Sequence, residues 1–171
     1  MSYKVLQPGL LSSIQDLGRF GQHDIGLTTG GPLDNEAFLW ANRILHNVPN
    51  ASAIELSFGG LQLLAQTSSY LCVTGAQLDL TINGVEKALW TSHKILPDDE
   101  IKLGYSSHGC RSYVSVAGGF NIHPSFGSSA TVVREKVGGI AGAKLAANDY
   151  LPCSRITQLP RQALAPEHRP L

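Results

Sequence analysis

Residues 15–21 place an amide, a carboxylate and a guanidinium next to two glycines in one short stretch. Ordering glycine costs much conformational entropy, and such polar side chains pack poorly, so the stretch suits a site better than a core. Arg19 has a planar fork that can hold a carboxylate or a phosphate in bidentate fashion, and Gln15 can assist it. Asp16 is a candidate for proton transfer or for orienting that fork. The alternative is an internal pair between Asp16 and Arg19 that only pins the loop.

A second glycine-rich stretch, residues 26–34, leads into a predicted helix whose first N–H groups could receive an anionic ligand. Asp34 at its end is either the helix N-cap or a further proton-transfer residue. Glu55 and Arg111 lie within or beside apolar strand sequences, where an unpaired charge is costly. They are therefore either a structural pair or site residues, with Glu55 as a catalytic and Arg111 as a substrate-binding candidate.

Several common kinds of site are excluded by spacing. The sequence nearest to a phosphate-binding P-loop, residues 138–145, has the wrong glycine spacing and no hydroxyl after Lys144. Neither the dinucleotide-binding Gly-x-Gly-x-x-Gly pattern nor the Gly-x-Ser-x-Gly nucleophile elbow occurs. The six histidines never fall at His-x-His or His-x-x-x-His spacing, so we expect no metal site in this chain. The Met-Lys-Met of a biotin acceptor is also missing.

Composition excludes further classes of partner and compartment. The 13 Lys and Arg residues balance 13 Asp and Glu residues without a long run of like charge, so we expect binding neither to nucleic acid nor to membrane. The sequence contains no signal-peptide pattern and no long apolar run, so we expect a cytoplasmic protein. Cys72, Cys110 and Cys153 are odd in number and far apart. We therefore expect reduced, buried thiols rather than disulfides or a structural zinc site.

Short apolar runs separated by paired glycines are typical of strands joined by turns. The clearest predicted hairpin joins residues 78–82 to residues 85–87 through Asn83 and Gly84, which tolerate the positive φ angles of a type I′ turn. Further strands are predicted over residues 54–58, 61–64, 70–74, 101–105 and 113–117. Because closure removes free strand edges, so many short strands favour a closed or nearly closed barrel.

One segment has helical rather than strand periodicity. Its apolar residues at helical spacing are Ala37, Phe38, Ala41, Ile44 and Leu45. With Asp34 as the N-cap, this spacing predicts one main helix over residues 34–46. The sequence after residue 152 has no clear period and is rich in proline. We therefore predict one domain over residues 1–152 and a linker or tail over residues 153–171.

Taken in order, several blocks form a specific pattern over residues 5–152. These blocks are residues 8–21, Gly26, Gly31, Asp34, and residues 41–45, 53–56, 74–76, 111–119 and 127–128. The pattern closely resembles the start of the allophanate hydrolase subunit 2 family, also called KipA-like and assigned as the C subunit of prokaryotic 5-oxoprolinase. Members of that family carry a second similar barrel beyond this point, so the chain is similar to the first half of such a protein.

The resemblance implies a mainly β fold, a cyclophilin-like β-barrel with one main helix and short additional helical turns, related to the carboxyltransferase region of urea carboxylase. It also implies that the chain acts together with a KipI-like (B) subunit and a LamB/YcsF-like (A) subunit. This complex would open 5-oxoproline to glutamate in an ATP-dependent reaction. ATP would bind at the level of the complex, and the chain would be inactive alone.

In that interpretation, side chains from both glycine-rich stretches and the strands share the site. The residues expected to bind a carboxylate or a phosphorylated intermediate are Gln15, Arg19 and Arg111, and those expected to take part in proton transfer are Asp16, Asp34 and Glu55. Two alternatives stay open. The first is a KipA-type regulatory protein that sequesters a KipI-like partner. The second is a urea carboxylase/allophanate-type carboxyltransferase component that works with a biotinylated partner.

Overall fold

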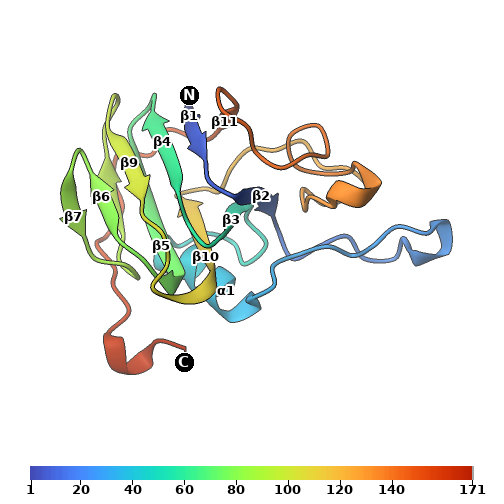
Figure 1. Cartoon of the computed structure of the whole chain (residues 1–171), viewed down its shortest axis with the longest axis horizontal. Coiled ribbons are helices and arrows are strands. Elements are labelled where there is room, and N and C mark those ends of the chain that lie inside the picture. Colours follow the sequence, from blue (N-terminus) through green and yellow to red (C-terminus); the bar gives the residue numbers. More distant parts are fainter. Residues whose placement is uncertain (171) are drawn as a thin grey trace.

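Two antiparallel sheets carry the fold (Figure 1), and the computed structural model describes residues 1–170. The six-stranded sheet has the spatial order β11 (Tyr150–Pro152), β1 (Ser2–Pro8), β4 (Leu61–Ala65), β9 (Glu100–Leu103), β6 (Leu80–Ile82) and β7 (Val85–Lys87). The five-stranded sheet has the order β2 (Leu11–Gln15), β3 (Ala53–Ser57), β10 (His108–Val116), β5 (Ser69–Gln77) and β8 (His93–Ile95).

The main hydrophobic core lies between the two sheets and takes side chains from both. Tyr3 and Val5 enter it from β1, and Val114 and Val116 enter it from β10. These residues are two positions apart in each strand because successive side chains of a strand point to opposite faces. Tyr113 and Ser115, whose side chains point to the opposite face of β10, are buried as well. The five-stranded sheet is therefore covered on both faces.

The helix α1 (Asn35–Ile44) covers the second face of the five-stranded sheet. Phe38 of this helix meets Tyr113 of β10 in an edge-to-face contact, with ring centroids 5.9 Å apart. The side chain of Asp34 caps the helix, since its Oδ1 accepts a hydrogen bond of 3.0 Å from the N–H of Ala37. The predicted helix is thus confirmed, although it ends at Ile44 rather than at residue 46.

The predicted fold class is confirmed: the described chain is mainly β, with one α-helix and the short helical turns η1 (His23–Ile25), η2 (Val133–Glu135) and η3 (Pro166–His168). The predicted hairpin is also confirmed, with positive φ angles at Asn83 and Gly84. Hydrogen bonding does not close the strands into one barrel, because one sheet ends at β11 and β7 and the other at β2 and β8. The chain passes from β3 in one sheet to β4 in the other through Gly59 and Gly60. No helix within residues 1–170 is long and apolar enough to cross a membrane.

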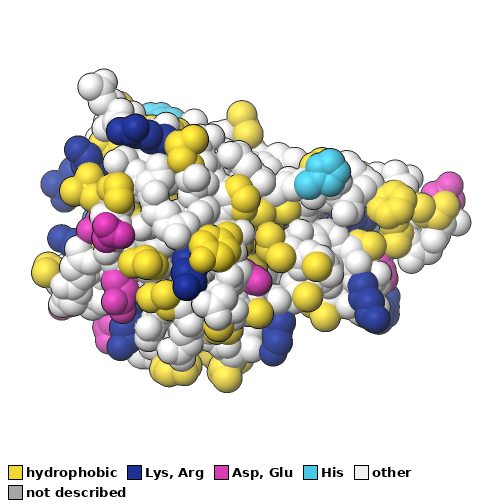
Figure 2. Space-filling view, turned by 90° about the horizontal axis from the view of Figure 1, so that it is seen from above, with side chains coloured by type: hydrophobic (Ala, Val, Ile, Leu, Met, Phe, Trp, Pro, Cys, Tyr) yellow, Lys and Arg dark blue, Asp and Glu magenta, His cyan; other side chains and the backbone are white. Residues whose placement is uncertain are grey.

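Residues 17–33 form an arm that projects from the sheets and carries η1 at its tip (Figure 1). The arm is fastened near η2, where the Glu135 carboxylate accepts a hydrogen bond of 3.0 Å from the N–H of Thr28. Figure 2 shows this part as a tapering extension, with acidic and basic side chains interspersed over the visible face. The surface in this view therefore has no large area of a single charge.

Residues 153–170 run back along the folded body. Ala163 forms a β-bridge with Thr91, and Leu164 is buried in a second hydrophobic cluster together with Phe38 of α1 and Tyr113 of β10. These contacts tie the end of the described chain to the five-stranded sheet. The domain boundary at residue 152 stays a prediction.

Gly59 provides a test of how closely the backbone before β4 passes the backbone that follows β9. Its φ is +97°, and a Cβ atom there would lie 2.0 Å from the carbonyl oxygen of Gly104. We expect Gly59→Ala to lower the free energy of unfolding by more than about 2 kcal/mol, since strain and overlap act together. Gly84→Ala is the control: its φ is +77° but nothing lies within 4 Å, so only about 1 kcal/mol of backbone strain is expected. Urea denaturation measures both, and equal losses would contradict the close approach of Gly59 to Gly104.

Candidate active-site cleft

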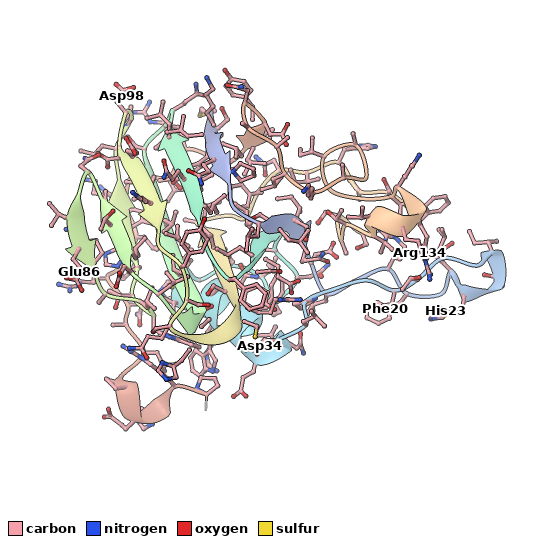
Figure 3. All side chains as sticks on the ribbon, in the orientation of Figure 1. Phe20, His23, Asp34, Glu86, Asp98 and Arg134 are labelled. Carbon is pink, nitrogen blue, oxygen red and sulfur yellow. The ribbon has the colours of Figure 1, made fainter. Side chains whose placement is uncertain are left out.

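A cleft of about 500 Å³ opens where β5 and β10 approach the start of α1. The register of these two strands shifts between His108 and Ser112, which leaves an irregular strand end at the surface. Gly75 permits this, because a Cβ atom there would lie 2.4 Å from the carbonyl oxygen of Arg111. Asp34, Trp90 and Arg111 line the cleft, and Figure 3 shows Asp34 at its helix end.

Glu55 does not line this cleft but lies buried behind its wall, in a hydrogen-bonded cluster. Its Oε2 accepts a bond of 2.8 Å from the N–H of Leu33 and one of 2.7 Å from the hydroxyl of Tyr113. The Tyr113 oxygen in turn accepts a bond of 2.8 Å from the N–H of Asp34. Strand register explains the pairing, since Glu55 of β3 lies directly opposite Tyr113 of β10.

Arg111 joins the same cluster from the cleft side. It precedes Tyr113 by two positions on β10, so both side chains lie on one face of the sheet. Its Nε lies 3.7 Å from Glu55 Oε1, too long for a hydrogen bond, and the side chain is 26% exposed. This Nε has no hydrogen-bond partner within residues 1–170. The guanidinium is therefore close to a counter-ion yet retains donors for a ligand in the cleft.

The electrostatics keep Tyr113 protonated, as a hydrogen-bond donor to Glu55. Burial raises the pKa of Tyr113 well above its usual range, and the neighbouring carboxylate of Glu55 raises it further, whereas the bond from the Asp34 N–H opposes both effects. The phenol therefore keeps its proton at neutral pH. A carboxylate, a phenol and a guanidinium beside a cleft can bind an anionic substrate and move a proton.

The structure brings together only some of the residues proposed from the sequence. Arg111 and Asp34 line the cleft with Glu55 buried beside Arg111, while Gln15, Asp16 and Arg19 form a second cluster at the base of the arm, the arm cluster. Within residues 1–170 the two ion pairs are Glu55 with Arg111 and Arg134 with Glu135. Asp16 and Arg19 therefore do not pair with each other, which was one of the two alternatives left open.

The carboxylate of Asp16 is fully engaged. It is 4% exposed and accepts bonds from the N–H of Gly18 at 2.9 Å, from the hydroxyl of Ser128 at 2.5 Å, and from both the N–H and the hydroxyl of Ser129 at 2.7 Å and 3.1 Å. Buried carboxylates are stable when hydrogen bonds replace the lost water in this way. These contacts tie the base of the arm to residues 128–129. A role of Asp16 in proton transfer stays a prediction.

Arg19 is also buried, at 1% exposed. Its Nη2 donates a bond of 2.6 Å to the carbonyl of Ala130, and its Nε donates one of 3.4 Å to the carbonyl of Ser125. The backbone N–H of Arg19 also bonds the carbonyl of Thr29 at 2.7 Å, across the arm. The side chain therefore ties the two loops together, and substrate binding by Arg19 stays a prediction.

Gln15 connects the two clusters. Its Oε1 accepts a bond of 3.2 Å from the N–H of Gly31, while its Nε2 donates one of 3.2 Å to the carbonyl of Thr131. Residues 29–34, which we call the strap, are thus held at Thr29 and Gly31 by the arm cluster and at their other end by Glu55 and Tyr113. A disturbance at Gln15 can therefore reach the cleft through the strap.

Sequence reasoning missed Tyr113, Trp90 and the serine pair at 128–129 as parts of these clusters. Tyr113 had a usable signal, because it lies two positions after Arg111 in a predicted strand and hence on the same face. No spacing linked the serines to Asp16, since they lie more than 100 positions away, although Ser128 belongs to the family pattern. Within residues 1–170 no group of three or more His, Cys, Asp or Glu side chains is arranged to hold a metal ion.

The chain is similar in sequence and in structure to known proteins. The family described as carboxyltransferase domain, subdomain A and B, matches residues 25–170. The C subunit of 5-oxoprolinase from Escherichia coli (strain K12) is 32% identical over 154 residues, a match that covers 89% of this chain and 49% of that protein. The urea amidolyase of Lachancea kluyveri is 30% identical over 174 residues, which covers 99% of this chain and 10% of that protein. The crystal structure of the Kluyveromyces lactis urea amidolyase superposes with a TM-score of 0.88 at 30% identity, covering 96% of this chain and 10% of that one.

The chain therefore spans about half the length of the E. coli protein that it matches and about a tenth of the urea amidolyases.

The arm cluster predicts a large stability effect of Asp16. Asp16→Ala would leave two backbone N–H groups and two hydroxyls without their buried acceptor, so we expect a loss of roughly 2–4 kcal/mol in the free energy of unfolding. Asp24→Ala, at the exposed tip of the same arm, should change it by less than about 0.5 kcal/mol. Urea denaturation distinguishes the two. Similar values for both variants would mean that the four hydrogen bonds do not anchor the arm.

The cysteines give a second test, because the expectation that all three are buried is wrong for Cys110. The turn at Gly109, with φ +81°, leaves Cys110 exposed in the cleft wall. Burial raises the pKa of Cys72 to about 12 and that of Cys153 to about 11. At pH 8 we expect a thiol reagent to modify Cys110 quickly in the native protein, and Cys72 and Cys153 only after unfolding. Peptide mapping identifies the site, and early labelling of Cys72 or Cys153 would contradict the described packing.

Proposed function

The chain belongs to the carboxyltransferase domain (subdomain A and B) family, and we propose that it is a subunit of an ATP-dependent 5-oxoprolinase. The reaction converts 5-oxoproline, ATP and water into glutamate, ADP and phosphate. The similarity to a protein named as the C subunit of 5-oxoprolinase supports this reaction. A lactam resists hydrolysis, so coupling its opening to ATP is chemically sensible.

One observation carries the proposal: Arg111 lies beside the hydrogen-bonded pair of Glu55 and Tyr113 at the cleft. In the proposed complex the Arg111 guanidinium binds the carboxylate of 5-oxoproline, the recognition for which its fork is suited. Glu55 Oε1 lies beside Arg111; it accepts a proton from the attacking water and passes it to the ring nitrogen as the C–N bond of the lactam breaks. Tyr113 holds the other carboxylate oxygen and fixes the orientation of Glu55.

The remaining candidates support the cleft rather than face the substrate in this proposal. The Asp34 side chain caps α1 while its N–H bonds Tyr113. Gln15, Asp16 and Arg19 hold the arm and the strap. Their mutation should therefore affect activity through stability and positioning.

We assign ATP to the assembled complex, with a KipI-like (B) subunit and a LamB/YcsF-like (A) subunit as partners. The word "subunit" in the name of the E. coli relative supports an assembly of several chains. The present chain contributes the Arg111 cleft to that assembly.

A second candidate is carboxyl transfer in a urea carboxylase-type enzyme. It is favoured by the similarity to urea amidolyases in both sequence and structure. Under that alternative the cleft would receive urea, and a biotinylated partner would deliver the carboxyl group. Urea carries no carboxylate for Arg111 to bind, which is why we place this candidate second.

The test is glutamate formation from 5-oxoproline and ATP when the protein is mixed with candidate A and B subunits. We expect Glu55→Gln, which keeps the size but removes the proton acceptor, to lower kcat by about 100-fold or more. Arg111→Lys keeps the charge but loses the fork, so KM for 5-oxoproline should rise by roughly tenfold with less change in kcat. Both variants should keep a melting temperature close to that of the unmodified protein.

Arg134→Lys is the matched control, since Arg134 lies on η2 with its side chain 83% exposed. Its kinetics should not change. Tight binding to a B-type partner without any glutamate would instead support a KipA-type regulatory protein. Carboxylation of urea by a biotinylated partner, without glutamate formation, would support the second candidate.

A further inference from the structure

Thr74 lies in β5 directly opposite Tyr113 of β10 and is fully buried. A row of neighbouring side chains therefore crosses the five-stranded sheet on one face, from Glu55 in β3 through Tyr113 to Thr74. The threonine hydroxyl donates a hydrogen bond of 2.7 Å to the backbone carbonyl of Ala37, in the first turn of α1. The start of the helix is thus tied to the strand beside Tyr113.

The first turn of α1 in turn fixes Asp34. The Asp34 side chain accepts a bond of 3.0 Å from the N–H of Ala37, and its carbonyl accepts one of 3.1 Å from the N–H of Phe38. The backbone N–H of Asp34 donates a bond of 2.8 Å to the Tyr113 oxygen. Starting from Thr74, the contacts therefore pass through the helix start and Asp34 to Tyr113, which lies beside Thr74 again.

The bond from Asp34 decides where the phenol proton of Tyr113 points. A phenolic oxygen both donates and accepts hydrogen bonds, and its proton turns to the side where an acceptor lies. Because the Asp34 N–H occupies the accepting side, the proton is directed to Glu55 Oε2, with the two oxygens 2.7 Å apart. Without the Asp34 N–H the hydroxyl could turn away, and Glu55 would lose a fixed donor. The orientation of Glu55 therefore depends on the start of α1.

We infer that Thr74 is a positioning residue, which keeps the Asp34 N–H on the Tyr113 oxygen through the first turn of α1 and so keeps Glu55 in its orientation. This anchor is separate from the hold on the strap at Gly31, because it reaches Asp34 from the helix side. The inference rests on the proposed function only where it links the orientation of Glu55 to turnover. The effect on the Asp34 N–H can be measured without catalysis.

The alternative is that Thr74 only satisfies its own buried hydroxyl, while the contact of Phe38 with Tyr113 holds the helix. Ser115 provides the comparison. It is also fully buried in the sheet, and its hydroxyl donates a bond of 2.6 Å to Oδ1 of Asn42 in the last turn of α1. Both hydroxyls join the sheet to the same helix, Thr74 at its start and Ser115 near its end.

Amide hydrogen exchange of the full chain, measured by NMR, tests the positioning. Thr74→Val keeps the branched shape but removes the hydroxyl, so the Asp34 amide should exchange about tenfold faster or more than in the unmodified protein. Thr74→Ala, which loses the hydroxyl without adding apolar volume, should behave like Thr74→Val. Thr74→Ser keeps the hydroxyl and should restore slow exchange.

Ser115→Ala is the matched control. It should lower the urea midpoint as Thr74→Val does, yet leave the Asp34 amide protected. Equal acceleration at Asp34 in Thr74→Val and Ser115→Ala would overturn the inference, because it would mean that any loosening of the helix has the same effect. Unchanged exchange at Asp34 in both Thr74→Val and Thr74→Ala would overturn it as well.

The reconstituted assay with A and B subunits tests the link to turnover. Thr74→Val should lower kcat by about tenfold with KM for 5-oxoproline unchanged, because Arg111 keeps its place. Thr74→Ser should recover most of kcat, and Ser115→Ala should keep it. Faster exchange at Asp34 with an unchanged kcat would overturn the link to turnover. No glutamate from the unmodified protein, with exchange at Asp34 as predicted, would count against the proposed reaction and leave the positioning supported.

Discussion

Burial of the Asp16 carboxylate is the constraint on which the rest of the site depends. Residues 17–33 leave the sheet as irregular backbone, and buried irregular backbone must find hydrogen-bond partners outside a strand ladder. Asp16 supplies acceptors for Gly18 and for the serine pair at 128–129, so two loops distant in sequence are fixed to one carboxylate. Without that carboxylate, the base of the arm would have several buried donors and no acceptor for them.

This anchoring matters for chemistry because the arm returns to the sheet as the strap, residues 29–34. Gln15 holds the strap at Gly31, and two positions later the backbone N–H groups of Leu33 and Asp34 reach Glu55 and Tyr113. The cleft residues are therefore oriented by backbone groups whose own position is set at the arm. Glu55 and Tyr113 in turn hold the end of the strap, so the two clusters stabilise each other. Polar networks of this kind are cooperative, and the loss of one member weakens the others.

Much of the fold could be predicted from the sequence because local signals and tertiary structure agree. Asn83 and Gly84 form the turn of a hairpin. Asp34 caps a helix whose apolar residues, spaced at the helical period, are buried against the sheet. The separation into two sheets could not be predicted, since it depends on pairings between strands far apart in the sequence, such as β1 with β11 and β3 with β10. The site was predictable in its residue types but not in its grouping. Glu55, Arg111 and Asp34 come together only through strand register, and Asp16 meets partners that no local spacing reveals.

The central claim is that the arm cluster positions the cleft through the strap. Amide hydrogen exchange, measured by NMR in the unmodified protein and in Gln15→Ala, tests it most directly. Gly31 loses its acceptor in this variant and should exchange faster in any case. We predict that the amides of Leu33 and Asp34 also lose protection, although their own acceptors on Glu55 and Tyr113 are untouched. Faster exchange at Gly31 alone, with Leu33 and Asp34 as protected as before, would contradict it.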